Sequence, residues 1–246
     1  MKKFILIIVL LLASSAFICG ETAADILFLM KTPSASAVIV GNAPVYDTRD
    51  GKILYFLPEG VIVCVYEDYS GEWYYISELL SHDPGWVKKE NLNIFNAPCK
   101  KEPVNRSQLE RYMNITGIGS ETDYLIFTDL SRNFTHVFRG KKGNWHLIKS
   151  MLCSTGKYDS PTVRGVFKIT ERGEWFFSER LGSGGKFWLR IKGSYLFHSQ
   201  AMDAEMNILP ENNGLGEHIT NGCIRLSTED AEWLYRNIPD NTTVFI

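Results

Sequence analysis

The sequence predicts a mainly β protein, in which a small β-barrel is followed by a larger β-rich domain with one late helix. Its 246 residues suffice for two modest domains. Hydrophobic residues make up 45% and charged residues 22%, which is typical of a chain that buries a core. Short runs of branched and aromatic residues alternate with turn-forming residues over most of the length, and helical periods are rare.

The charge balance argues against one class of partner. Lysine and arginine number 26, aspartate and glutamate number 28, and the formal net charge is −2. Binding nucleic acid requires a clustered cationic surface that neutralises phosphates. We therefore expect no nucleic acid among the partners.

The N-terminus has the pattern of a secretory signal. Two lysines precede a short apolar run over residues 4–12, and small residues follow. We expect the signal to span residues 1–24 and the protein to be extracytoplasmic. The run is short for a membrane span, but an uncleaved anchor reaching Ile18 remains open and would be the only membrane contact.

Turn signals divide residues 37–95 into several short strands. Asp50-Gly51 is a hairpin signal, and Ser70-Gly71 marks another turn. Short strands in close succession, without a long helical period, predict a small β-barrel. A linker over residues 96–121 follows. Within it, Ser107 and Glu110 match a capping box and predict a short helix over residues 108–113.

Residues 122–246 form the second predicted domain. Its aromatic and branched runs predict strands at residues 124–130, 135–139, 145–153, 165–170, 187–191, 195–198 and 242–246. Ser227 is the predicted N-cap of the late helix, and Pro239 ends it. The glycine-rich segment 182–186 fails the phosphate-loop pattern, so we interpret it as a flexible hairpin tip that could cover a site.

The cysteines form no metal pattern. Four follow Cys19, and none lies in a C-x-x-C spacing. We expect neither a metal nor a cofactor. For Cys64 and Cys153 we expect burial as small apolar residues within strands, although an oxidising compartment leaves disulfides open.

The densest chemical cluster surrounds Cys223. Gly222 precedes it in a predicted strand-to-helix turn, where nearby backbone amides can point at a developing oxyanion. A thiol needs a neighbouring imidazole to become a nucleophile at neutral pH. Of the five histidines, His198 ends an apolar strand and is the candidate base, whereas His218 is closer in sequence but lies in a predicted loop.

These residues fall in an ordered set of motifs. The set comprises Cys153-Ser154-Thr155-Gly156, Ser160-Pro161-Thr162, Gly165-Val166-Phe167, Phe197-His198-Ser199, Leu215-Gly216, Thr220-Asn221-Gly222-Cys223-Ile224-Arg225-Leu226 and Asp230-Ala231. It resembles the signature of the L,D-transpeptidase (YkuD-type) family, and the resemblance covers residues 123–246. A chance match is unexpected because the motifs are several and in order.

The resemblance implies a role for each matching residue. Cys223 matches the nucleophile and His198 the histidine that activates it. The backbone carbonyl of Ser199 is expected to hold the imidazole. Gly222 matches the glycine that shapes the oxyanion pocket, and Arg225 the arginine that orients the thiol region or a substrate carboxylate.

One position departs from the family pattern. The family often has Ser-His-Gly-Cys where this chain has Thr220-Asn221-Gly222-Cys223. Asn221 can replace the missing histidine if that position mainly donates a hydrogen bond. If the position shares proton transfer, activity should fall unless His218 compensates.

The N-terminal unit carries a weaker resemblance. Its run of short strands, closed by Gly85-Trp86-Val87 and followed by Leu92, resembles a bacterial SH3-like domain. Such domains often bind wall peptides. A spacer barrel without a ligand remains equally open.

The family resemblance implies cofactor-free acyl transfer on peptidoglycan stem peptides, outside the cytoplasm or at the cell wall. It also implies inhibition by carbapenems that acylate Cys223. Three alternatives stay open: a wall-binding protein with a silenced catalytic domain, an L,D-carboxypeptidase in which water replaces the acceptor, and a cysteine hydrolase of ordinary peptides.

Overall fold

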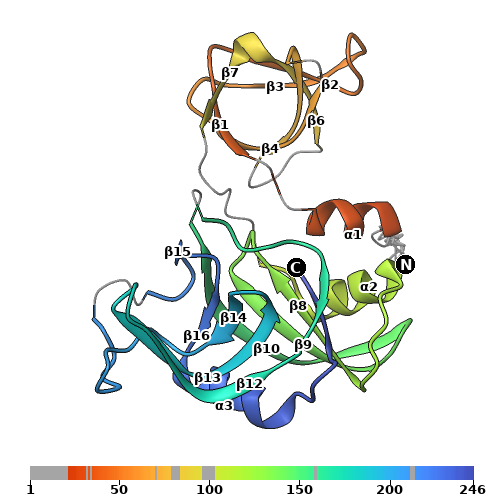
Figure 1. The fold of residues 1–246 in the computed structure, drawn as a ribbon. Helices are drawn as coiled ribbons and strands as arrows, with labels where there is room; N and C mark the ends of the chain where they lie inside the picture. The colour runs from red at the N-terminus through yellow and green to blue at the C-terminus, as the bar shows by residue number, and fades with distance from the viewer. Residues whose placement is uncertain are drawn as a thin grey trace, which may run out of the picture.

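The computed structural model describes residues 22–31, 33, 35–69, 71–78, 84–95, 103–157, 160–210 and 214–246. The predicted signal up to residue 21 and the start of the predicted linker, residues 96–102, lie outside this part. Figure 1 shows two β units with a short helix, α1, between them. The predicted mainly β class is confirmed.

The N-terminal unit is a curled antiparallel sheet. Its seven strands run in the order β3-β2-β6-β5-β4-β1-β7. They are β1 Ala35–Ile39, β2 Ala43–Tyr46, β3 Ile53–Leu57, β4 Ile62–Tyr69, β5 Trp73–Glu78, β6 Gly85–Lys88 and β7 Leu92–Phe95, with a 3-10 turn at Lys89–Asn91. Val45, Val63, Ile76 and Val87 are fully buried at its centre. That this unit is SH3-like stays a prediction.

Helix α1, Ala23–Met30, was not predicted from the sequence. Thr22 caps its N-terminus, and Asp25 completes a capping box with it. The segment was missed because its first two residues were assigned to the signal and no element was assigned to the apolar residues that follow. Met30 packs into the C-terminal unit, residues 103–246, and the ring of Phe28 lies 4.8 Å from that of Tyr66 in β4. The helix therefore contacts both units.

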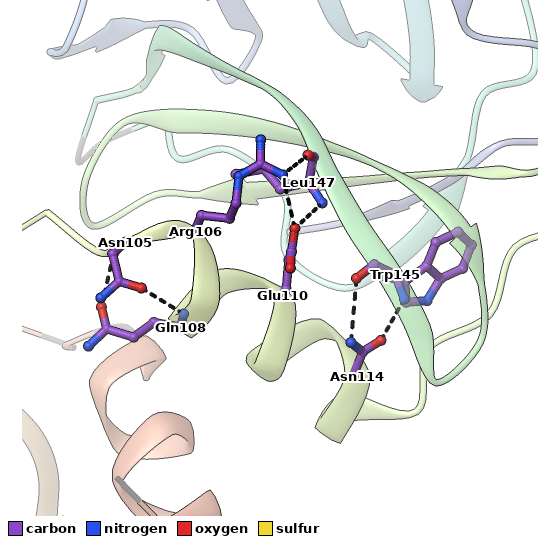
Figure 2. Close-up of polar contacts among 7 residues, drawn as sticks. All are labelled: Asn105, Arg106, Gln108, Glu110, Asn114, Trp145 and Leu147. Atoms are coloured by element: carbon purple, nitrogen blue, oxygen red, sulfur yellow. Dashed lines mark hydrogen bonds and ion pairs between the residues drawn. The ribbon is translucent and has the colours of Figure 1, made fainter. Parts of the chain in front are cut away.

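Helix α2, Arg106–Thr116, confirms the predicted short helix and extends it at both ends. The predicted cap is wrong. Asn105 is the N-cap and forms the capping box with Gln108, because the helix begins before Ser107. Glu110 instead accepts a hydrogen bond from the backbone N–H of Leu147, as Figure 2 shows.

A second contact fixes α2 to the sheet of the C-terminal unit. The Asn114 side chain accepts a hydrogen bond of 2.7 Å from the backbone N–H of Trp145 and donates one to its carbonyl (Figure 2). The Trp145 ring is fully buried. The helix thus closes one face of the sheet with both apolar and polar contacts.

The C-terminal unit is built on one large sheet. Its order is β11-β17-β8-β9-β10-β16-β14-β13-β12, and β15 pairs with β10. The strands are β8 Tyr124–Asp129, β9 Phe134–Lys141, β10 Asn144–Gly156, β11 Val166–Lys168, β12 Arg172–Ser178, β13 Ser183–Lys192, β14 Tyr195–His198, β15 His218–Thr220, β16 Ile224–Leu226 and β17 Thr243–Phe245. Strands β12, β15 and β16 were not predicted.

The late helix is confirmed as α3, Thr228–Asn237. The hydroxyl of Ser227 accepts a hydrogen bond from the backbone N–H of Asp230, as an N-cap should. Ala231 and Leu234 are fully buried against the core side of the sheet. Among the described residues, no helix is long and apolar enough to span a bilayer.

Only Gly182 of the segment 182–186 lies in the turn of the hairpin, and the rest of the segment is strand. Residues from Ser183 onward belong to β13, and Gly184 and Gly185 pair with Phe177 and Phe176 of β12. The chain turns earlier, where the N–H of Gly182 bonds to the carbonyl of Glu179. Glycine is needed here for close packing: a Cβ at Gly184 would lie 2.0 Å from the carbonyl oxygen of Phe176.

A buried histidine in this unit predicts acid sensitivity. His136 in β9 is 4% exposed, its Nδ1 lies 2.9 Å from the Ser150 hydroxyl, and burial lowers its pKa to about 4. In the unfolded chain the His136 imidazole takes up a proton near its ordinary pKa of about 6.5. The free energy of unfolding is therefore highest above about pH 6.5 and decreases as the pH falls toward 4.

We expect His136 to lower the free energy of unfolding by about 3 kcal/mol between about pH 6.5 and pH 4. Thermal denaturation from pH 7 to 4 should show a shallower decline for His136→Gln than for the unchanged protein. An identical pH slope for the two proteins would contradict the prediction. His146, which is exposed on β10, provides the matched control as His146→Gln.

Candidate active site

Two neighbouring parallel strands bring the predicted nucleophile and base together. Strand β14 ends at His198, and β16 begins directly after Cys223. In their register, Phe197 faces Ile224 and His198 faces Arg225. Cys223 therefore lies on the strand adjacent to that of His198, two residues before Arg225, the pairing partner of His198.

Alternation along the strands places them on one face. Phe197, Ile224 and Leu226 are fully buried in the core that α3 covers. Side chains alternate between the two faces of a sheet, so His198 and Arg225 lie on the opposite face. Cys223, two positions before Arg225, projects from the same side, and the Arg225 charge acts on both Cys223 and His198.

The His198 imidazole is held in one orientation. Its Nδ1 lies 2.7 Å from the backbone carbonyl oxygen of Ser199, which is the contact expected from the sequence. A carbonyl only accepts, so Nδ1 carries the proton and Nε2 is the basic nitrogen. The Phe176 ring meets the imidazole edge-on, with centroids 5.2 Å apart and planes at 84°.

Gly185 completes the wall around the imidazole. A Cβ at this position would lie 2.6 Å from Nδ1 of His198 and 3.2 Å from the Phe176 ring. Any side chain would therefore displace the histidine. This role was not predicted from the sequence, because a glycine pair next to a turn is also typical of a hairpin tip.

Ser199 contributes more than its carbonyl. It is fully buried, and its hydroxyl accepts a hydrogen bond of 2.8 Å from the backbone N–H of Lys186. The N–H of Ser199 in turn bonds to the Lys186 carbonyl. This pair of contacts fixes the chain just after the histidine against β13.

Gly222 shapes the turn before Cys223. Its φ of 105° lies in a region that favours glycine, and a Cβ would meet the Tyr195 ring at 2.7 Å. Its N–H donates to the Thr220 hydroxyl at 3.2 Å, and that hydroxyl donates to the Cys223 carbonyl at 2.6 Å. Thr220 thus fastens both sides of the turn.

The surroundings of the thiol favour its neutral form. Cys223 is partly exposed, and its Sγ lies 3.5 Å from the carbonyl oxygen of Ser194. Burial raises the thiol pKa, and the Leu196 backbone contact and the Arg225 charge only partly oppose this. Burial and Arg225 together lower the pKa of His198 to about 3. Both shifts favour a neutral thiol and a neutral imidazole as the resting pair.

This electrostatic state predicts the pH dependence of the thiol. Thiolate absorbance at 240 nm should be absent at pH 7 and should appear only above the pH range in which an ordinary cysteine ionises. The second free thiol, Cys153, does not interfere because burial raises its pKa to about 12. A titration of the unchanged protein minus that of Cys223→Ala measures this. A thiolate signal already present at pH 6 would contradict it.

The remaining predicted site residues lie close by in different settings. Arg225 is half-buried, and burial lowers its pKa while the Cys223 side chain opposes the shift. Asn221 is exposed. His218 is not a solvated loop residue: it begins β15, and its ring contacts Thr155 and Asn133.

Two other cysteines, Cys64 and Cys153, are buried in strands. Cys153 is free and fully buried in β10, as predicted. Cys64 is also buried, but it is disulfide-bonded, so the expectation of a simple apolar residue is incomplete. Among the described residues, no group of three or more His, Cys, Asp or Glu side chains is arranged to hold a metal ion.

Comparisons with known proteins identify similar sequences and structures. Over 113 residues the chain is 41% identical to YciB of Bacillus subtilis (strain 168), named as an L,D-transpeptidase; the match covers 43% of this chain and 58% of YciB. A Clostridium acetobutylicum structure, of a fused zinc-dependent amidase, peptidase and peptidoglycan-binding-domain protein, shares 29% identity over 57% of this chain and 59% of that chain, with a TM-score of 0.49. The chain thus spans less than two thirds of either relative.

One further solved structure is an L,D-transpeptidase in complex with imipenem. It shares 15% identity over 87% of this chain and 98% of that chain, with a TM-score of 0.42. The family model for the YkuD L,D-transpeptidase catalytic domain matches residues 123–246, which include the whole sheet that carries Cys223 and His198. The chain therefore belongs to the YkuD family of L,D-transpeptidase catalytic domains.

Proposed function

We propose that this protein is a peptidoglycan L,D-transpeptidase whose acyl-enzyme forms on Cys223. The observation that carries the proposal is the β14–β16 pair, which sets Cys223, His198 and Arg225 on one face and fixes the basic nitrogen of His198 through Ser199. The family acts on stem peptides of peptidoglycan. A nucleophile, a base and an orienting group in this arrangement suit acyl transfer.

In the first half of the reaction, the Cys223 sulfur attacks the carbonyl carbon of the residue that precedes a terminal D-amino acid. Because the resting pair is neutral, the thiol proton moves to Nε2 of His198 as the sulfur–carbon bond forms. Backbone amides near Gly222 and Cys223 stabilise the oxyanion, with roughly 3 to 4 kcal/mol per donor. The peptide bond then breaks, and His198 returns its proton to the departing amine.

In the second half, an acceptor amine from another stem attacks the thioester carbonyl and gives a proton to His198. The carbon–sulfur bond breaks, and the thiol of Cys223 regains the proton. The product is an amide cross-link, and no cofactor takes part in this proposal. If water replaces the amine, the same residues perform an L,D-carboxypeptidase reaction.

We also propose that the protein acts outside the cytoplasm, secreted or at the cell wall. The disulfide at Cys64 supports this, because such bonds persist in oxidising compartments. In this proposal the N-terminal unit, in its predicted SH3-like role, holds the enzyme near its substrate.

A donor tetrapeptide ending in D-alanine, offered with a free D-amino acid as acceptor, tests the function by mass spectrometry of the products. We expect exchange of the terminal residue by the unchanged protein and none by Cys223→Ala. Release of D-alanine without exchange would indicate a carboxypeptidase, and cleavage of an all-L peptide would indicate a hydrolase. Peptide binding without turnover would favour a wall-binding protein silenced by Asn221.

A further inference from the structure

The side chains of Asn133, Thr155 and His218 form a closed hydrogen-bond network at the start of β15, the strand that leads to the Cys223 turn. Oδ1 of Asn133 lies 2.8 Å from the Thr155 hydroxyl, and that hydroxyl lies 2.9 Å from Nδ1 of His218. Nδ2 of Asn133 lies 3.3 Å from Nε2 of His218 and 3.1 Å from the carbonyl oxygen of Gly216. These residues come from the β8–β9 turn, from β10 and from β15.

Donor and acceptor chemistry orients the whole network. Nδ2 of Asn133 can only donate, so Nε2 of His218 accepts and carries no proton. Nδ1 of His218 therefore carries the proton and donates to the Thr155 hydroxyl. That hydroxyl in turn donates to Oδ1 of Asn133. Each group has one consistent role in these contacts, which together fix the orientation of the imidazole.

Asn133 is suited to this place by its backbone as well as its side chain. Its φ is 56°, a left-handed conformation that asparagine adopts more readily than most residues, and its side chain is buried. Its carbonyl accepts a hydrogen bond from the N–H of Cys153 in β10. The preceding turn is braced by the buried ion pair of Asp129 and Arg132, with atoms 2.6 Å apart.

The network holds the segment that leads to the nucleophile. The backbone N–H of Thr155 bonds to the Glu217 carbonyl, and that of Lys157 bonds to the Thr220 carbonyl. Thr220 then fastens the turn through the Cys223 carbonyl. The chain from residue 214 to Cys223 is thus attached to β10 by side chains at its start and by Thr220 at its end.

We propose that Asn133, Thr155 and His218 are positioning residues that set the Cys223 turn for acylation. The proposal rests on the proposed function, since it concerns the same nucleophile. The three residues do not touch the reacting atoms. They act by fixing the backbone that presents the thiol and the amides beside it, where a misplacement of about 1 Å can cost a hundredfold in rate.

Thr155→Val tests this most directly, because it removes the hydroxyl and keeps the shape. Thr128→Val is the matched control, since it removes the buried hydroxyl contact of Thr128 with Thr135, 3.1 Å long, away from the Cys223 turn. We expect the second-order rate of acylation by imipenem to fall at least tenfold in Thr155→Val and less than threefold in Thr128→Val. Thr155→Ser should restore it to within threefold.

Two further readouts separate positioning from general destabilisation. Alkylation of Cys223 by iodoacetamide needs no oxyanion donor, so its rate should change less than threefold in Thr155→Val. Hydrogen exchange of the backbone amides over residues 214–223 should rise in Thr155→Val relative to Thr128→Val. His218→Ala should reproduce both results if Thr155→Val fails to fold.

The outcomes are distinct. Unchanged acylation in both Thr155→Val and His218→Ala, or an equal loss in Thr128→Val, would overturn the proposal, as would unchanged hydrogen exchange. If the unchanged protein is alkylated but never acylated, the proposed function fails, and the exchange measurement alone decides whether the network holds the turn.

Discussion

Replacing His198 with glutamine should lower the rate of Cys223 acylation by about 10² to 10⁴, the usual contribution of general base catalysis. The expected loss is large because the resting thiol is neutral: burial raises its pKa, so without a base it holds its proton at neutral pH. Glutamine keeps a hydrogen-bonding side chain but removes the proton acceptor. Stopped-flow measurement of the acylation rate with imipenem is the test.

The control for this variant is His146→Gln, at an exposed position of β10. It should leave the acylation rate within threefold. The pH profile adds a second check. With the pKa of His198 at about 3, the unchanged protein should keep its base unprotonated from pH 7 down to pH 5. A loss of acylation that follows a pKa near 6.5 would contradict this assignment.

Gly185→Ala should lower the same rate by about 10², although it adds a single methyl group. The new Cβ would lie 2.6 Å from Nδ1 of His198, where it displaces the imidazole and breaks its contact with the Ser199 carbonyl. A small shift of a catalytic group away from its working geometry is enough for such a loss.

Gly119→Ala is the matched control, because the nearest atoms to its added Cβ are 3.7 Å away on Lys142. Imidazole nitrogen shifts measured by NMR should show a changed hydrogen bond at His198 in Gly185→Ala alone. Unchanged acylation and unchanged imidazole shifts in Gly185→Ala would contradict the prediction, because they would show that a methyl group fits beside His198 without displacing it.

Local patterns predicted much of the fold. The late helix was predicted from Ser227 and its acidic first turn, and strand β14 from the apolar run that ends at His198. The short strands β15 and β16 were not predicted, since three residues carry too little alternation to be recognised. Helix α1 was missed because its apolar residues directly follow the predicted signal.

The sequence predicted which residues form the site more completely than it predicted what each of them does. Motif resemblance singled out Cys223 and His198, and strand pairing then brought them together. The role of Gly185 depends on how β13 lies against β14. Such a contact between two segments cannot be recognised from the local sequence. His218 was assigned to a solvated loop for the same reason, because its partners Asn133 and Thr155 are far away in the chain.

The central claim, that Cys223 is the residue acylated in the reaction, is tested most directly by mass spectrometry of the intact protein after incubation with imipenem. We expect one covalent adduct on the unchanged protein, located by peptide mapping to Cys223, and none on Cys223→Ala. Cys153 should stay unmodified because it is fully buried. An adduct that persists in Cys223→Ala, or no adduct on a folded unchanged protein, would contradict the account.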